Sequence, residues 1–146
     1  MEKFNLATAT DSYKASHFLQ FPPNMKQAEY YLSARVPDMK ARLFGLQAII
    51  KKYFMSVPTM AQIDEAAELW EAHGEPFHYE GWKEINELGF LPLRIKSLPE
   101  GLVVPGDIPL VTTTNTTDTS GWLPGWIETL LMQVWYPTTV CTKSYD

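Results

Sequence analysis

The segment at residues 9–23, ATDSYKASHFLQFPP, gathers side chains that could carry out chemistry within a few positions of one another. Asp11, Tyr13, Lys14 and His17 supply a carboxylate, an aromatic ring, an amine and an imidazole. Such groups can accept hydrogen bonds, stack on a flat ligand, attract an anion or exchange a proton near neutral pH. The segment is therefore the first candidate for a functional site.

Each of these side chains also has a structural interpretation. Asp11 can cap a short helix, and Tyr13 would ordinarily be a core or interface aromatic. His17 shares the helical face of Tyr13, and we expect a packed, hydrogen-bonded histidine rather than a catalytic one. Lys14, and Arg35 further along the chain, would ordinarily be solvated charges. Taken alone, the residues leave both interpretations open.

The composition predicts a folded protein and argues against several functions. The chain has 146 residues, 45% of them apolar, which suits one domain with a core. Its net charge of -5 argues against a general nucleic-acid binder, and three His with one Cys are too few for a typical structural zinc site. A lone Cys favours a reducing compartment, and no apolar run approaches the ~20 residues of a membrane helix. We expect a cytoplasmic protein with no metal site of its own.

The elements that must position the candidate residues follow from the hydrophobic pattern. A short helix is expected from Asp11 to Phe21, stopped by two prolines. Residues 27–36 alternate as a strand does, which puts Arg35 on the polar side, and residues 41–55 have the pattern of an amphipathic helix. Further helices are expected at 59–74, 80–89 and 122–135, and strands at 91–98 and on both sides of 105–106. This order predicts an α+β fold.

Several other residues attract attention but have simpler explanations. Trp122, Trp126 and Trp135 have helical spacing, which is typical of a core or a dimer interface rather than a ligand cage. Cys141 has no evident histidine partner, so we expect a small buried residue and not a nucleophile. The last residues have no clear helix cap, and we expect another element to begin where the given sequence ends.

Four sequence blocks are distributed over nearly the whole length of the chain. They are TDSYKASH with QFPP after it, FGLQAIIKKY at 44–53, LPEGLVVP at 98–105 and WLPGWIETLLMQVWYPTTVCT at 122–142. In this order they resemble the N-terminal part of nicotinamide phosphoribosyltransferases, which are type II phosphoribosyltransferases. The resemblance implies a single N-terminal mixed helix and sheet domain over 1–146. Residues from about 120 to 146 would lead into a catalytic α/β barrel that lies beyond residue 146.

The resemblance also implies a role for each candidate residue. The family enzyme joins nicotinamide to phosphoribosyl diphosphate, with Mg²⁺, at sites shared across a homodimer, and releases nicotinamide mononucleotide and diphosphate. Tyr13 would stack on the pyridine ring in the partner's site, with Asp11 capping its helix near the ligand. Lys14 and Arg35 would supply positive charge near phosphates. No catalytic residue is assigned within these 146 positions.

Two interpretations of function remain. The chain is expected either to be the N-terminal part of such an enzyme, inactive without a barrel in the same or a second chain, or to be a stand-alone binding or dimerisation module of that family. Retention of DSYK and Arg35 favours the first. The sequence does not distinguish nicotinamide from nicotinic acid as substrate, although the TDSYK form favours nicotinamide.

Overall fold

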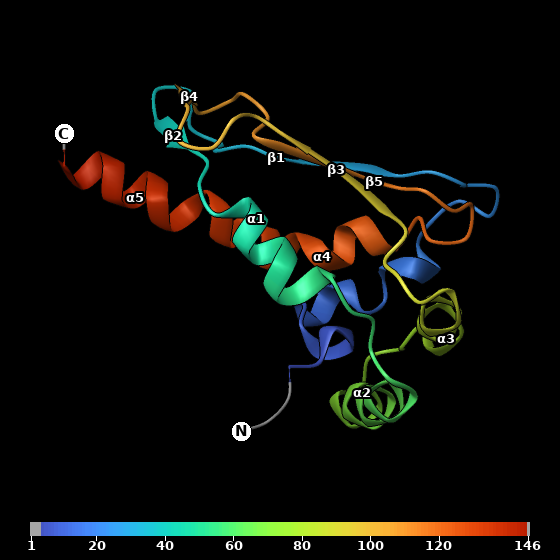
Figure 1. Ribbon diagram of the computed structural model, residues 1–146. Helices are drawn as coiled ribbons and strands as arrows, with labels where there is room; N and C mark the ends of the chain where they lie inside the picture. Colours follow the sequence, from blue (N-terminus) through green and yellow to red (C-terminus); the bar gives the residue numbers. More distant parts are fainter. Residues whose placement is uncertain (1–3, 146) are drawn as a thin grey trace.

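A computed structural model describes residues 4–145 of the chain as a mixed helix and sheet fold (Figure 1). Its main sheet is antiparallel with the order β1-β5-β3, built from Glu29–Leu32, Val111–Asn115 and Leu93–Ser97. A second, two-stranded sheet pairs β2 (Lys40–Arg42) with β4 (Val103–Pro105). The described strands form no closed barrel, and the expected α+β class is confirmed.

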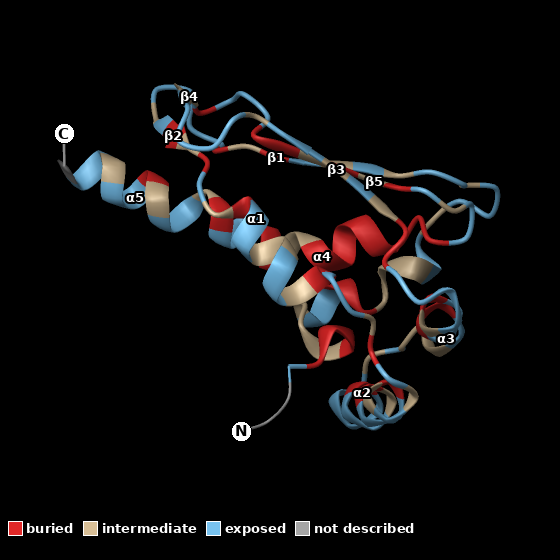
Figure 2. Cartoon of the chain, viewed as in Figure 1, coloured by how far each residue is buried: buried red, intermediate tan, exposed pale blue. Residues whose placement is uncertain are grey.

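Helix α4 (Leu123–Leu131) runs beneath the main sheet and continues through a 3-10 turn, η5 (Met132–Val134), into α5 (Tyr136–Tyr145). It packs against β1 closely, because a Cβ placed on Gly125 would lie 2.9 Å from the Tyr30 hydroxyl. Nearly every residue of α4 is buried (Figure 2). None of the described helices has the length and apolar character needed to cross a bilayer.

Helices α2 (Met60–His73) and α3 (Tyr79–Leu88) pack against each other at one end of the molecule (Figure 1). The expected capping box of Thr59 and Gln62 is present, and Gly74 ends α2 with φ +80°. Gly89 ends α3 in the same way. The sequence predicted both helices, because their capping signals involve residues only a few positions apart.

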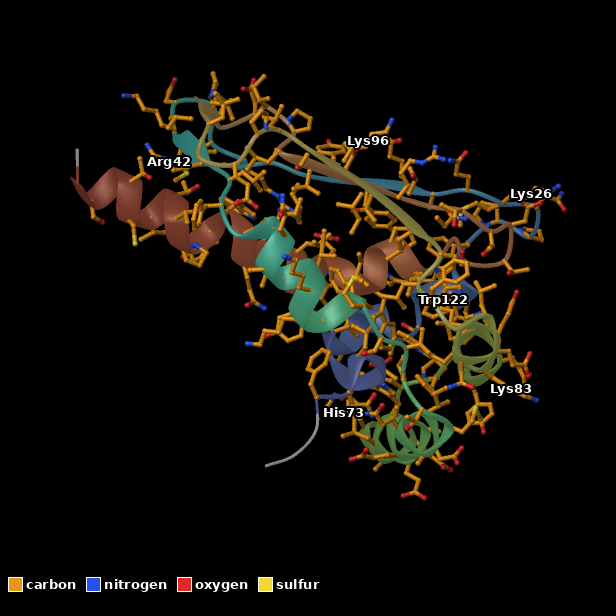
Figure 3. The ribbon with its side chains drawn as sticks, viewed as in Figure 1. Lys26, Arg42, His73, Lys83, Lys96 and Trp122 are labelled. Carbon is orange, nitrogen blue, oxygen red and sulfur yellow. The ribbon has the colours of Figure 1, made fainter. Side chains whose placement is uncertain are left out.

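Aromatic side chains fill the core between these two helices and α4. Trp122 and Trp126 are buried, so the core interpretation of these two residues is confirmed, whereas Trp135 is only half-buried. Figure 3 shows Trp122 beside α3, where its ring meets that of Trp82 with centroids 5.0 Å apart. Edge-to-face contacts of this kind favour a fixed arrangement of rings.

Two helical predictions and one burial prediction were wrong. Residues 11–21 form two short 3-10 turns, η2 (Ser12–Lys14) and η3 (His17–Leu19), instead of one helix. The predicted helix at 41–55 starts late, because its first residues belong to β2. Gly45, with φ +93°, turns the chain into α1 (Leu46–Ile49), which continues as a π-helix over Ile50–Phe54. Cys141 is exposed rather than buried.

Candidate functional site

All four site residues predicted from the sequence line one cleft of about 790 Å³. Asp11, Tyr13 and Lys14 come from the N-terminal segment around η2, and Arg35 comes from the bend that follows β1. The opposite wall is the end of α4, with η5 and the start of α5. The remaining lining residues are Tyr31, Leu32, Ser33, Ala34, Val36, Met39, Glu128, Met132, Trp135 and Tyr136.

Three tyrosines leave much of their surface exposed along this cleft. Tyr13 is 59% exposed, Tyr31 63% and Tyr136 58%, which is unusual for large aromatic side chains in a folded domain. The ring of Tyr13 is tilted against that of His17 with centroids 5.4 Å apart, so the two share a face as expected. Exposed rings at a concave surface can stack on a flat ligand.

Lys14 lines the cleft, but its side chain is almost completely buried in the cleft wall. Its side chain is only 5% exposed, and its Nζ lies 3.4 Å from Asp11 Oδ2 and 3.5 Å from Glu128 Oε2. Nζ also donates a hydrogen bond of 3.1 Å to Thr129 Oγ1. In this arrangement the ammonium group is directed at protein oxygens, and the expected solvated charge is not found.

Asp11 occupies the N-cap position of η2 but does not cap it. Its side chain makes no capping hydrogen bond; instead Asp11 Oδ2 accepts a hydrogen bond of 2.8 Å from the Thr129 hydroxyl. The prediction of a helix cap was therefore wrong. The physical reason is that the Thr129 hydroxyl and the Lys14 ammonium group compete successfully with the backbone N–H groups of the turn for the carboxylate.

Arg35 differs from Lys14 in having no protein partner among residues 4–145. Its side chain is exposed at the cleft, and within that range no ion pair or hydrogen bond of its guanidinium group is found. A guanidinium group in this state can bind an anion without first leaving another partner. Among the cleft-lining cations, Arg35 is thus the one available to a ligand.

The side chains that line this cleft, within residues 4–145, are not arranged as metal ligands. No group of three metal-ligating side chains occurs in the described part of the chain. The two carboxylates that line the cleft, Asp11 and Glu128, both lie next to Lys14 Nζ. These residues do not fit a Mg²⁺ ion held by the protein alone, since Mg²⁺ sites of this type use free carboxylates together with substrate phosphates.

Tyr30 lies behind the cleft wall, where β1 meets α4. Burial raises the pKa of the Tyr30 hydroxyl, and the nearby Glu128 carboxylate raises it further. The phenol therefore stays neutral at physiological pH and acts as a packing element against Gly125. It is not a candidate for proton transfer.

A family model described as the N-terminal domain of nicotinamide phosphoribosyltransferase matches residues 5–95, well over half of the chain. The chain belongs to this family. A nicotinamide phosphoribosyltransferase of Xanthomonas campestris pv. campestris is 47% identical over 146 residues, covering 97% of this chain and 31% of the relative. One from Acinetobacter baylyi is 29% identical, covering 99% of this chain and 32% of the relative.

The chain therefore spans about a third of the length of these nicotinamide phosphoribosyltransferases. The crystal structure of human nicotinic acid phosphoribosyltransferase matches it with a TM-score of 0.61 and 17% identity. That match covers 90% of this chain and 26% of the human one. At this identity the likeness shows the fold alone, which is that of the N-terminal domain of a type II phosphoribosyltransferase.

Sequence reasoning missed several residues of the cleft in this family member. Tyr31, Glu128, Thr129 and Tyr136 were not singled out, although they line the cleft or hold its wall. Glu128 and Thr129 lie more than a hundred residues from the DSYK segment, so no local spacing links them to it. Only the tertiary fold reveals their role.

Proposed function

We propose that this chain supplies the N-terminal domain of an enzyme that makes nicotinamide mononucleotide and diphosphate from nicotinamide and phosphoribosyl diphosphate. The observation that carries the proposal is one cleft that unites Tyr13 with Arg35, whose guanidinium group has no ion-pair or hydrogen-bond partner within residues 4–145. Family membership and the two nicotinamide phosphoribosyltransferase relatives support it. A cytoplasmic location is part of the proposal, supported by the lone cysteine.

In this proposal Tyr13 and Arg35 bind the two chemically different parts of the reactants. The exposed ring of Tyr13 stacks on the pyridine ring of nicotinamide, which is flat and electron-poor. The free guanidinium group of Arg35 binds phosphate oxygens of phosphoribosyl diphosphate. Diphosphate accumulates negative charge as the pyridine nitrogen attacks the anomeric carbon, so a cation at that end favours the transition state.

The chain alone is expected to be inactive, because it spans about a third of the length of its relatives. The rest of the site would come from a barrel in the same or a second chain, and from a homodimer partner that receives Tyr13. Mg²⁺ would enter with the oxygens of phosphoribosyl diphosphate, because the residues described here do not form a site for it. No step of the proposal uses Mg²⁺ held by this chain.

A second candidate function is a non-catalytic binding or dimerisation module. The open tyrosine-lined cleft would suit such a module equally well. What separates the candidates is whether the cleft supports turnover once it is joined to the remainder of a relative. The lack of a partner for Arg35 within residues 4–145 favours the enzyme, since a scaffold gains little from such a cation at a cleft.

The test is an assay of nicotinamide mononucleotide formation with phosphoribosyl diphosphate and Mg²⁺. It compares the chain alone with a chimera in which this chain replaces the matching 31% of the Xanthomonas campestris relative. We expect turnover by the chimera and none by the chain alone. A folded chimera without turnover would favour the module, and turnover by the chain alone would refute its expected inactivity.

A further inference from the structure

The segment that carries Tyr13 is attached to α4 through a compact polar network. Lys14 Nζ lies 3.1 Å from Thr129 Oγ1, 3.4 Å from Asp11 Oδ2 and 3.5 Å from Glu128 Oε2. Thr129 closes the network by donating its hydroxyl proton to Asp11 Oδ2 over 2.8 Å. Two adjacent residues of α4 thus hold both charged neighbours of Tyr13.

The network encloses the Lys14 ammonium group, which donates a hydrogen bond to Thr129 Oγ1 and forms ion pairs with Asp11 and Glu128. That group has three N–H bonds, and three oxygen atoms lie around it, while its side chain is 5% exposed. Two carboxylates surround one ammonium, so the local charge is negative rather than positive. An anionic ligand would be repelled here and would find its cation at Arg35 instead.

The 3-10 turn η2 has little intrinsic stability. Element η2 has three residues, its backbone bonds join Lys14 N to Asp11 O and Ala15 N to Ser12 O, and it lacks a side-chain cap. Such a short 3-10 turn is marginal in water without tertiary contacts. Lys14 Nζ also lies 5.9 Å from the centroid of the Tyr13 ring, which links the network directly to the exposed aromatic.

We propose that Glu128 and Thr129 are positioning residues that hold the Tyr13 ring at the cleft through Lys14 and Asp11. Lys14 is then an internal tie between the N-terminal segment and α4, not a phosphate contact. This inference rests on the proposed function for its effect on substrate. The network itself can be tested without any activity.

The first arm of the test measures amide hydrogen exchange in the 146-residue chain. Thr129→Val keeps the side-chain shape and removes the hydroxyl, so the amides of Lys14 and Ala15 should exchange about tenfold faster. Thr129→Ser should restore slow exchange, and Glu128→Gln is a second variant should Thr129→Val not fold. Thr142→Val is the matched control, because among the described residues the Thr142 hydroxyl bonds to Thr138 O within α5 and not to the N-terminal segment. Unchanged amide exchange of Lys14 and Ala15 in both Thr129→Val and Glu128→Gln would contradict the proposed role of the network.

The second arm measures substrate dependence in the chimera with the Xanthomonas campestris relative. Thr129→Val and Lys14→Met should each raise the KM for nicotinamide about threefold or more, and leave that for phosphoribosyl diphosphate within about twofold. A raised KM for phosphoribosyl diphosphate in Lys14→Met alone would overturn the inference, because Lys14 would then be an anion contact. An inactive wild-type chimera would refute the proposed function, and the exchange arm would still decide the network.

Discussion

The aromatic side chains of this domain fall into two regions that differ sharply in burial. At one end, tryptophans from α2, α3 and α4 lie inside the molecule with ring centroids 5.0–6.1 Å apart. At the cleft, tyrosines from three segments are more than half exposed. The members are Trp70, Trp82, Trp122 and Trp126 in the first region and Tyr13, Tyr31 and Tyr136 in the second.

This difference indicates what each region does. A buried ring contributes to stability by leaving water, whereas an exposed ring at a concave surface contributes little until a ligand covers it. The same contrast separates the two cleft cations: Lys14 is surrounded by protein oxygens and Arg35 is not. Stability is therefore expected to depend on the tryptophan region and ligand binding on the cleft.

The largest effect is expected from Trp82→Ala. The Trp82 ring is fully buried against Trp122 and Trp126, and within residues 4–145 its Nε1 has no hydrogen-bond partner, so its contribution is packing. The free energy of unfolding should fall by about 3–5 kcal/mol in urea titrations of the chain. Tyr31→Ala is the control and should cost under about 1 kcal/mol. Similar decreases in the free energy of unfolding for both variants would contradict the proposed difference between the two regions.

The next effect concerns Arg35→Ala in the chimera. Loss of a charge-assisted hydrogen bond should raise the KM for phosphoribosyl diphosphate about 10- to 100-fold. The KM for nicotinamide and the thermal midpoint should change little, since Arg35 has no partner within residues 4–145. Steady-state kinetics with each substrate varied separately would measure this. An unchanged KM for phosphoribosyl diphosphate would remove Arg35 from the proposed site.

Tyr13→Ala should have a smaller and complementary effect. Stacking is worth roughly 0.5–1.5 kcal/mol beyond area burial, so the KM for nicotinamide should rise about two- to tenfold. Because the Tyr13 ring is mostly exposed, stability should be nearly unchanged. Tyr13→Phe is the matched control and should retain the wild-type KM. Equal KM values for Tyr13→Ala and wild type would contradict the role of the ring.

The smallest effect is a pH dependence at the edge of the tryptophan region. Burial lowers the pKa of His78 below its ordinary value of about 6.5, partly offset by Glu84 and Glu80, and its ring stacks on Phe18. The unfolded chain therefore takes up this proton first, and the stability contribution of His78 is lost as the pH falls below about 6.5. Relative to His78→Phe, the wild type should lose stability on acidification. The same dependence of unfolding free energy on pH in the wild type and in His78→Phe would contradict this role of His78.

The sequence predicted the elements whose signals are local. Two of these signals mark the ends of α2: the capping box of Thr59 and Gln62, and Gly74. They could be recognised because the groups that interact lie three or four residues apart in the sequence. The alternation at 27–36 predicted a strand with Arg35 on its polar side; Arg35 is indeed exposed, but it lies in a bend because β1 ends at Leu32. The resemblance supplied the family, which the comparisons confirm.

The failures have a common physical cause. A helix after Asp11 was expected from spacing alone, but the carboxylate bonds to Thr129, 118 residues away, instead of the turn. The spacing of Leu43 and Leu46 is compatible with two local structures. One is the continuous helix that was predicted, and the other is the observed strand, followed by a left-handed Gly45 and a new helix. Long-range contacts decided both cases, and Glu128 escaped notice for the same reason.

The most direct measurement of the central claim is saturation-transfer NMR of nicotinamide on the chimera, with irradiation of tyrosine ring protons. If the Tyr13 ring stacks on the pyridine ring, the nicotinamide signals should lose intensity in the wild type. The Tyr13→Leu variant should show much less transfer and weaker nicotinamide binding, while Tyr31→Leu retains both. Equal transfer and equal affinity in the wild type and Tyr13→Leu would contradict the account.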